Sequence, residues 1–142
     1  MNKRSATGVA IGWLLASTAI GAPLTVEIHG QLKADTVVRV AAYGSAEQWL
    51  EKPSGANDLR VGADAVQKRV QAVDIADLAP GAYAIAVYVD ENGNGKLDRG
   101  AFGIPSEPYG FSRGGGSFGP PAFADALVEV PASGTTIRVD LE

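Results

Sequence analysis

The residues with the clearest capacity for chemistry lie in one short segment, Asp90-Glu91-Asn92-Gly93-Asn94-Gly95-Lys96-Leu97-Asp98. Oxygen-bearing side chains occupy its first, third, fifth and ninth positions, and Gly95 at the sixth allows a sharp turn. Ca²⁺ prefers about six to eight oxygen ligands, which alternate residues of one tight loop can supply. The spacing therefore predicts a calcium site formed by the side chains of Asp90, Asn92, Asn94 and Asp98 and the backbone carbonyl of Lys96.

The segment lacks the last ligand of an EF-hand loop. Ala101 stands at the twelfth position in place of a bidentate glutamate, and a strand rather than a helix is expected before the loop. Glu107 is the only acidic residue between Asp98 and Asp125, so we expect it to supply the missing oxygen. Affinity should fall in the weak range of extracellular sites, roughly 0.1–1 mM. The alternative to the calcium site is a metal-free Asn-Gly hairpin tip. The alternatives for Glu107 are a solvated loop charge or an ion pair with Arg99 or Arg113.

Two other motifs match known site patterns in sequence but lack the secondary structure that those sites require. Gly110-Phe111-Ser112-Arg113-Gly114 has the spelling of a hydrolase nucleophile elbow, which requires a helix after the serine. The glycines and prolines that follow forbid that helix, and the only histidine, His29, lies far upstream. The pattern Gly114-x-Gly116-x-x-Gly119 has no βαβ unit around it that would make it a dinucleotide site. We predict no catalytic residues.

Residues 100–121, which we call the flap, are the candidate binding surface. Between Asn92 and Pro121 the chain places nine of its 18 glycines and four of its 8 prolines, so no regular strand pairing is expected there. Aromatic residues within this region indicate an ordered, packed segment. We expect the flap to bind a protein or a glycan through Tyr109, Phe111, Ser112 and Phe118. The alternative is a small secreted enzyme that uses Glu107, Tyr109 and Ser112; polar groups bonded only to backbone would favour the binding module.

The strand that must position the loop runs from Ala82 to Val89. It carries no charge and is apolar on both faces, which predicts a central strand covered on both sides. Pro80-Gly81 before it suits a type II turn. The spacing to Tyr83 predicts a tyrosine corner, in which the phenol bonds to upstream backbone.

The remaining elements predict an all-β protein. Short strands are expected over residues 24–28, 36–43, 66–75, 126–130 and 135–141, with a loop over residues 53–58. A single short helix is predicted after Ser45, which with Gln48 forms a capping box. We predict one domain over residues 23–142, an antiparallel immunoglobulin-like or transthyretin-like sandwich of six to eight strands with one short helix and a long Gly/Pro-rich flap.

Residues 1–22 read as a signal peptide that would direct the chain to the periplasm or outside the cell. Lys3 and Arg4 precede an apolar stretch, and Ala19-Ile20-Gly21 fits a signal-peptidase site. An uncleaved membrane anchor is the alternative, but small and polar residues dilute the stretch. Loss of the two basic residues Lys3 and Arg4 would change the formal net charge from −4 to −6, which argues against nucleic acid as a partner and is compatible with cations. After cleavage no stable membrane insertion is expected, and the absence of cysteine excludes disulfides.

Several segments together resemble one bacterial family. They are Leu78-x-Pro80-Gly81-x-Tyr83-Ala84-Ile85, the loop from Asp90 to Asp98, Phe102-Gly103-Ile104-Pro105-x-Glu107-Pro108-Tyr109-Gly110-Phe111-Ser112 and Gly119-Pro120-Pro121-x-Phe123. The chain resembles, from about Leu24 to Leu141, the uncharacterised bacterial family known as domain of unknown function 2141. The resemblance implies a secreted or periplasmic single-domain β protein and supplies no reaction. Val89 departs from relatives that carry histidine before the first aspartate.

Overall fold

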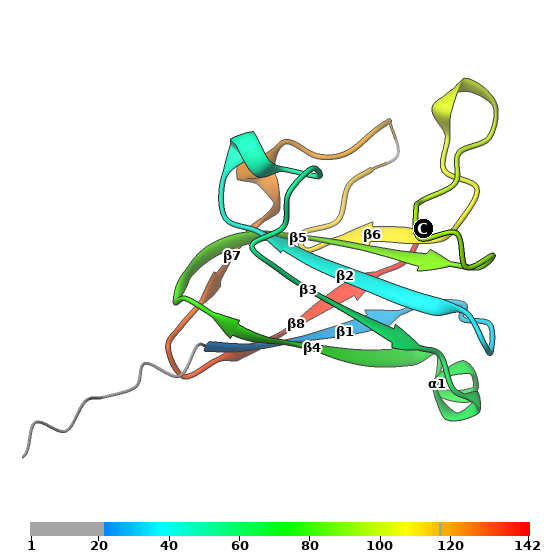
Figure 1. The fold of residues 1–142 in the computed structure, drawn as a ribbon, viewed down its shortest axis with the longest axis horizontal. Coiled ribbons are helices and arrows are strands. Elements are labelled where there is room, and N and C mark those ends of the chain that lie inside the picture. Colours follow the sequence, from blue (N-terminus) through cyan, green and yellow to red (C-terminus); the bar gives the residue numbers. More distant parts are fainter. Residues whose placement is uncertain (1–21, 117) are drawn as a thin grey trace, which may run out of the picture.

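The chain folds into two β-sheets packed face to face (Figure 1). The computed structural model describes residues 22–116 and 118–142, so the signal peptide predicted at residues 1–22 lies, apart from Ala22, outside the described residues. The three-stranded sheet has the order β4 (Val70–Leu78), β1 (Ala22–His29), β8 (Thr135–Asp140). The five-stranded sheet has the order β3 (Gly55–Arg60), β2 (Val37–Tyr43), β5 (Gly81–Asp90), β6 (Tyr109–Phe111), and β7 (Leu127–Val130) also pairs with β5.

The core lies between the two sheets and follows the alternation of the strands. In β1, Leu24, Val26 and Ile28 are fully buried while the residues between them are half-buried. In β5, Tyr83, Ile85, Val87 and Val89 face the same core. Burial of such aliphatic side chains stabilises the fold by about 1.5–3 kcal/mol each, so this shared interior holds the sheets together.

The predicted all-β sandwich is confirmed, with one exception to its antiparallel pairing. β1 runs antiparallel to β4 but parallel to β8. β5 is central as predicted, because β2 pairs with one edge of it and β6 and β7 share the other. Its second face is less covered than predicted, since Ala86 and Tyr88 are only half-buried.

The tyrosine corner is confirmed. The Tyr83 hydroxyl donates a 2.7 Å hydrogen bond to the Ala79 carbonyl, four residues upstream. This bond fixes the turn that brings the chain from β4 into β5.

Four local predictions were wrong. Pro80-Gly81 does not form a type II turn, because Gly81 begins β5 and lacks the positive φ that this turn requires. Residues 55–60, predicted mostly as loop, form the edge strand β3, whose exposed polar residues hide its pairing with β2. The start of the strand predicted at residues 66–75 is the end of helix α1 (Ala63–Lys68), and the strand begins only at Val70. The helix predicted after Ser45 is a short 3-10 turn, η1 (Ala46–Gln48), and Ser45 makes no side-chain capping bond.

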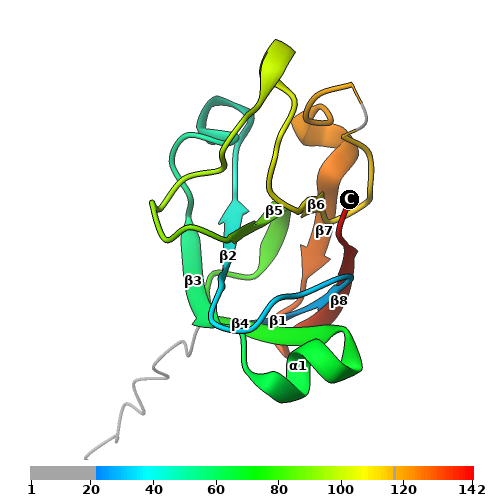
Figure 2. The same ribbon diagram turned by 90° about the vertical axis from the view of Figure 1, so that its right-hand side faces the viewer.

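The flap contains more regular structure than predicted. β6 pairs with β5 over three residues, and two 3-10 turns, η2 (Ala101–Gly103) and η3 (Phe123–Ala126), lie within and after the flap. Tyr109 and Glu142 exchange backbone hydrogen bonds, which closes β6 against the end of β8. The hairpin between Arg99 and Pro105 and the segment that follows residue 117 extend from the same end of the molecule, as Figure 2 shows. Within the described ranges, no helix has the length and apolarity needed to cross a membrane.

Candidate functional site

The loop predicted to bind calcium begins at the last residue of β5. Asp90 ends that strand opposite Val37 of β2, and the chain then turns through Gly93 and Gly95, which have φ values of 75° and 80°. These left-handed conformations favour glycine because other residues pay a steric cost there. The sharp turn expected at Gly95 is therefore present.

Asp90 organises the loop from its base. Its carboxylate is 1% exposed. Oδ1 accepts hydrogen bonds from the backbone N–H groups of Gly93 at 2.7 Å and Asn94 at 3.2 Å, and Oδ2 accepts one from Gly95 at 2.8 Å. One side chain thus holds three consecutive amides of the turn.

Arg39 is the partner of Asp90 that the loop sequence does not contain. Its Nε and Nη2 both lie 3.2 Å from Oδ2 of Asp90, and its Nη1 pairs with Asp58 on β3. Burial alone would raise the pKa of the Asp90 carboxyl. The hydrogen bonds from the Gly95 amide, Arg39 and the Gly93 amide outweigh that effect, so the pKa lies below its ordinary value.

The other predicted ligands gather around Asp98. The side-chain amides of Asn92 and Asn94 both donate to its carboxylate, Asn94 at 2.7 Å. Their carbonyl oxygens accept the backbone N–H groups of Asn94 and Lys96, each at 3.1 Å. Loop positions three, five and nine are therefore brought together as the spacing predicted, whereas the hydrogen bonds of Asp90 at position one go to backbone amides of the turn and to Arg39.

Glu107 lies against the two ends of the loop. It is 6% exposed, and its Oε1 and Oε2 accept hydrogen bonds from the backbone N–H groups of Glu91 at 2.8 Å and Asp98 at 2.9 Å. The expectation that Glu107 reaches the loop agrees with this position. Its role as a metal ligand stays a prediction, because both contacts are to backbone.

The candidate ligands are oxygen atoms, which Ca²⁺ prefers, but they carry little negative charge. All the candidate ligands are oxygens, and each amide oxygen keeps a second lone pair beside the hydrogen bond it already accepts. The described residues contain no group of three or more carboxylate, imidazole or thiolate side chains placed to hold a metal ion. A cation in this loop would depend on the Asn92, Asn94 and Lys96 oxygens and on Asp98, with Asp90 already partly neutralised by Arg39.

The polar residues of the flap bond to backbone. The Tyr109 hydroxyl donates to the Gly116 carbonyl at 3.0 Å. The Ser112 hydroxyl accepts the Ile85 N–H at 3.1 Å and donates to the Ala126 carbonyl, so it links β5 to the turn before β7. Phe111 is buried, whereas Phe118 is fully exposed.

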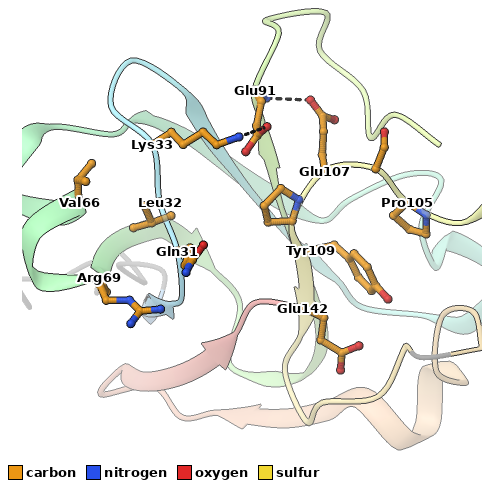
Figure 3. A pocket seen from close by; sticks show the side chains of 12 residues that line it. Gln31, Leu32, Lys33, Val66, Arg69, Glu91, Pro105, Glu107, Tyr109 and Glu142 are labelled. Atoms are coloured by element: carbon orange, nitrogen blue, oxygen red, sulfur yellow. Dashed lines mark hydrogen bonds and ion pairs between the residues drawn. The ribbon is translucent and has the colours of Figure 1, made fainter. Parts of the chain in front are cut away.

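An open pocket of about 590 Å³ lies beside the loop and is lined by side chains of both charges. Figure 3 shows Lys33 and Glu107 approaching Glu91 from opposite sides. Lys33 Nζ lies 2.8 Å from the Glu91 carboxylate, while Glu107 accepts the Glu91 backbone N–H. Lys33 and Glu91 are paired and Glu107 bonds to backbone, while Arg69 and Glu142 also line the pocket.

Sequence reasoning missed the site role of Arg39. The available signal was its charge, because Arg39 is the only charged residue in the otherwise apolar stretch from Thr36 to Tyr43. A lone charge in a half-buried strand needs a partner of opposite sign. The pairing of β2 with β5 supplies it, since Val37 lies opposite Asp90 and places Arg39 two residues along.

Comparison with known proteins yields a family and no named relative. No curated protein and no solved structure matches the chain. One family model, described as an uncharacterized protein conserved in bacteria, matches residues 26–138, which include all eight strands in whole or in part, the loop and the flap. The chain belongs to this bacterial family, DUF2141.

Proposed function

We propose that this protein is a non-catalytic extracytoplasmic module that binds a partner through its flap. The observation that supports this most directly is the bonding of Glu107, Tyr109 and Ser112, the three polar groups an enzyme would have used. Each directs its side-chain polar atoms to backbone groups. A serine nucleophile needs a base within hydrogen-bond reach, and among the described residues the polar atoms of Ser112 bond only to backbone. The Tyr109 hydroxyl is less reactive than usual, because burial and the nearby Glu142 carboxylate raise its pKa.

The loop adds a calcium-dependent element to this proposal. The approach of Asn92, Asn94 and Asp98 to one another supports cation binding, and Glu107 would complete the ligand set from the flap. Arg39 lowers the negative charge available at Asp90, so affinity falls within the weak range of extracellular sites, about 0.1–1 mM. Because Glu107 belongs to the flap, Ca²⁺ held there would order the flap and so shape its binding surface for a protein or a glycan.

Thermal unfolding with Ca²⁺ and with a chelator tests the calcium element. At about 1 mM Ca²⁺ and a dissociation constant of about 0.1 mM, binding stabilises the fold by about 1.4 kcal/mol, which raises the melting temperature by several degrees. Asp98→Asn should abolish the rise. Asp125→Asn, an exposed acid outside the loop, should keep it. Identical melting curves with Ca²⁺ and with chelator would refute calcium binding and favour the metal-free hairpin tip.

Cell fractionation tests the location. The proposal expects the mature chain in the periplasm or medium, with a mass that corresponds to loss of the segment predicted as a signal peptide. Recovery of the chain at full length in the cytoplasm would contradict it.

A further inference from the structure

A groove crosses the outer face of the five-stranded sheet beneath the flap. Its first part is a hollow of about 510 Å³ whose walls include Leu97, Arg99, Phe102, Ile104, Phe111 and Phe118. Its second part, about 550 Å³, continues over β2 and β5 and shares Leu97, Arg99 and Phe111 with the first. Hollows of this size are typical of small-molecule sites.

The rim of the first hollow exposes large apolar side chains. Phe102 and Phe118 are 101% and 104% exposed, and Ile104 is 63% exposed. Phe102 lies at the tip of a small hairpin in which Arg99 pairs with Pro105 and the Gly100 N–H donates to the Ile104 carbonyl at 2.7 Å. Its φ of 61° is a strained conformation for a bulky residue. Exposed aromatic rings on a constrained hairpin beside a hollow mark a binding surface rather than misplaced core.

Among the described residues that line the first hollow, Arg99 is the only charged one. Its Nη1 donates to the Gly103 carbonyl at 2.9 Å, and it forms no ion pair with the part of the chain that the structure describes. Where the hollow continues, its walls carry Lys96 and Glu51 and the Arg39–Asp58 ion pair, so the positive charge is concentrated at Arg99 in the first part. The chain as a whole is acidic, so this local positive charge beside apolar walls favours an anionic, largely apolar ligand.

The position of the groove favours a ligand without backbone polar groups. It lies on a sheet face, where the backbone groups of β2 and β5 already pair with neighbouring strands, so a peptide cannot add to it as a strand. The walls near Phe102 and Phe118 also offer few side-chain donors or acceptors for sugar hydroxyls.

We propose that this groove binds a monomeric single-chain anionic amphiphile. The alkyl chain lies along Phe102, Ile104 and Phe111, and the anionic head group pairs with Arg99. This inference rests on the proposed non-catalytic binding role of the flap, and in this groove it replaces the protein or glycan of that proposal with a small amphiphile.

Calorimetric titration of the full chain with decanoate, below the concentration at which it forms micelles, tests the inference. Decyltrimethylammonium has the same chain length and the opposite charge, and it should bind at least tenfold more weakly. Arg99→Gln should weaken decanoate binding by about tenfold, because a charge-assisted bond is lost. Phe102→Ser should weaken it too. Arg60→Gln and Leu59→Ser, exposed residues of β3 outside the groove, are the matched controls and should leave it unchanged.

Three outcomes would overturn the inference. They are equal binding of the two amphiphiles, binding of anionic phospholipid vesicles without binding of decanoate, and binding of an apolar peptide with a free carboxylate in place of decanoate. The titrations are run with Ca²⁺ and with chelator, so that the two proposals fail separately. A calcium-dependent melting shift without decanoate binding refutes only the ligand, whereas decanoate binding without that shift refutes only the calcium element.

Discussion

At the scale of single residues, the loop is built around one buried negative charge. Three backbone N–H groups and two nitrogens of Arg39 donate to the Asp90 carboxylate. Such charge-assisted bonds are roughly twice as strong as neutral ones, and they offset the burial of the charge. Asp90 therefore shapes the loop whether or not a cation is bound.

The Asp90 contacts predict a specific pH dependence. The pKa of this carboxyl is lowered in the folded protein, so its stabilising effect is present above the unfolded pKa of about 3.9 and is lost as the pH falls through the folded value. Asp90→Asn should cost about 1–3 kcal/mol at pH 7, and the gap from wild type should shrink below about pH 4. Urea unfolding between pH 3 and 7 measures this. Asp64→Asn, an exposed acid on α1, is the control, and a gap independent of pH would contradict the assignment.

Tyr83 allows a test of the corner that leads into β5. Tyr83→Phe leaves the Ala79 carbonyl without its donor and should lower the free energy of unfolding by about 1–3 kcal/mol. The matched control is Tyr88→Phe. The Tyr88 hydroxyl donates to the exposed Gly95 carbonyl at 2.9 Å, so its removal should lower the free energy of unfolding by less. If both variants lose the same free energy of unfolding, the corner hydrogen bond stabilises the fold no more than the exposed bond of Tyr88 does.

At the scale of elements, β6 closes the sandwich through a glycine. A Cβ built on Gly110 would lie 2.5 Å from the Asp140 carbonyl oxygen and 2.7 Å from Cγ1 of Val139, so only glycine lets β6 approach β8 this closely. The backbone bonds between Tyr109 and Glu142 follow from that approach. This contact joins the flap to both sheets.

Gly110→Ala should therefore cost about 1–3 kcal/mol, because a rigid backbone oxygen must move. Gly100→Ala is the control, since its nearest neighbour is 3.8 Å away and its φ of −88° suits alanine. Denaturant unfolding of both variants measures the difference. If the two substitutions cost the same, the close approach at β6 is not a constraint.

The elements also show what the sequence could predict. β5 was predictable because an uninterrupted apolar run needs cover on both sides. β3 was not, because its exposed polar residues read as loop and only β2 identifies them as an edge strand. Helix α1 was hidden by its six-residue length, too short to show a helical period.

The candidate site also has one part that could be predicted from the sequence and one that could not. The Asp90–Asp98 loop was predictable because its side chains bond to backbone within a few residues of themselves. The Arg39–Asp90 pair was not, because 51 residues separate the partners and only the register of β2 on β5 brings them together.

At the scale of the whole molecule, the loop and the flap are connected to the sandwich at several points. Glu107 joins both ends of the loop, Tyr109 pairs with the end of the chain, and Trp49 donates from its indole to the Pro121 carbonyl at 3.0 Å. Trp49 also packs against Phe111 and Phe123 at ring-centroid distances of 5.9 and 6.2 Å. These contacts predict that the flap unfolds together with the sheets.

Glu107→Gln tests that cooperativity. The amide keeps one acceptor and turns an NH₂ group toward a backbone N–H, so about 1–3 kcal/mol of stability should be lost. In a Trp13→Phe background, Trp49 is the only tryptophan and its fluorescence reports the flap, while far-ultraviolet circular dichroism reports the sheets. Both midpoints should fall together in a single transition.

Glu129→Gln on β7, an exposed position, is the control and should change neither midpoint. If the fluorescence midpoint falls while the dichroism midpoint stays constant, the flap is a separate unit and Glu107 stabilises it alone.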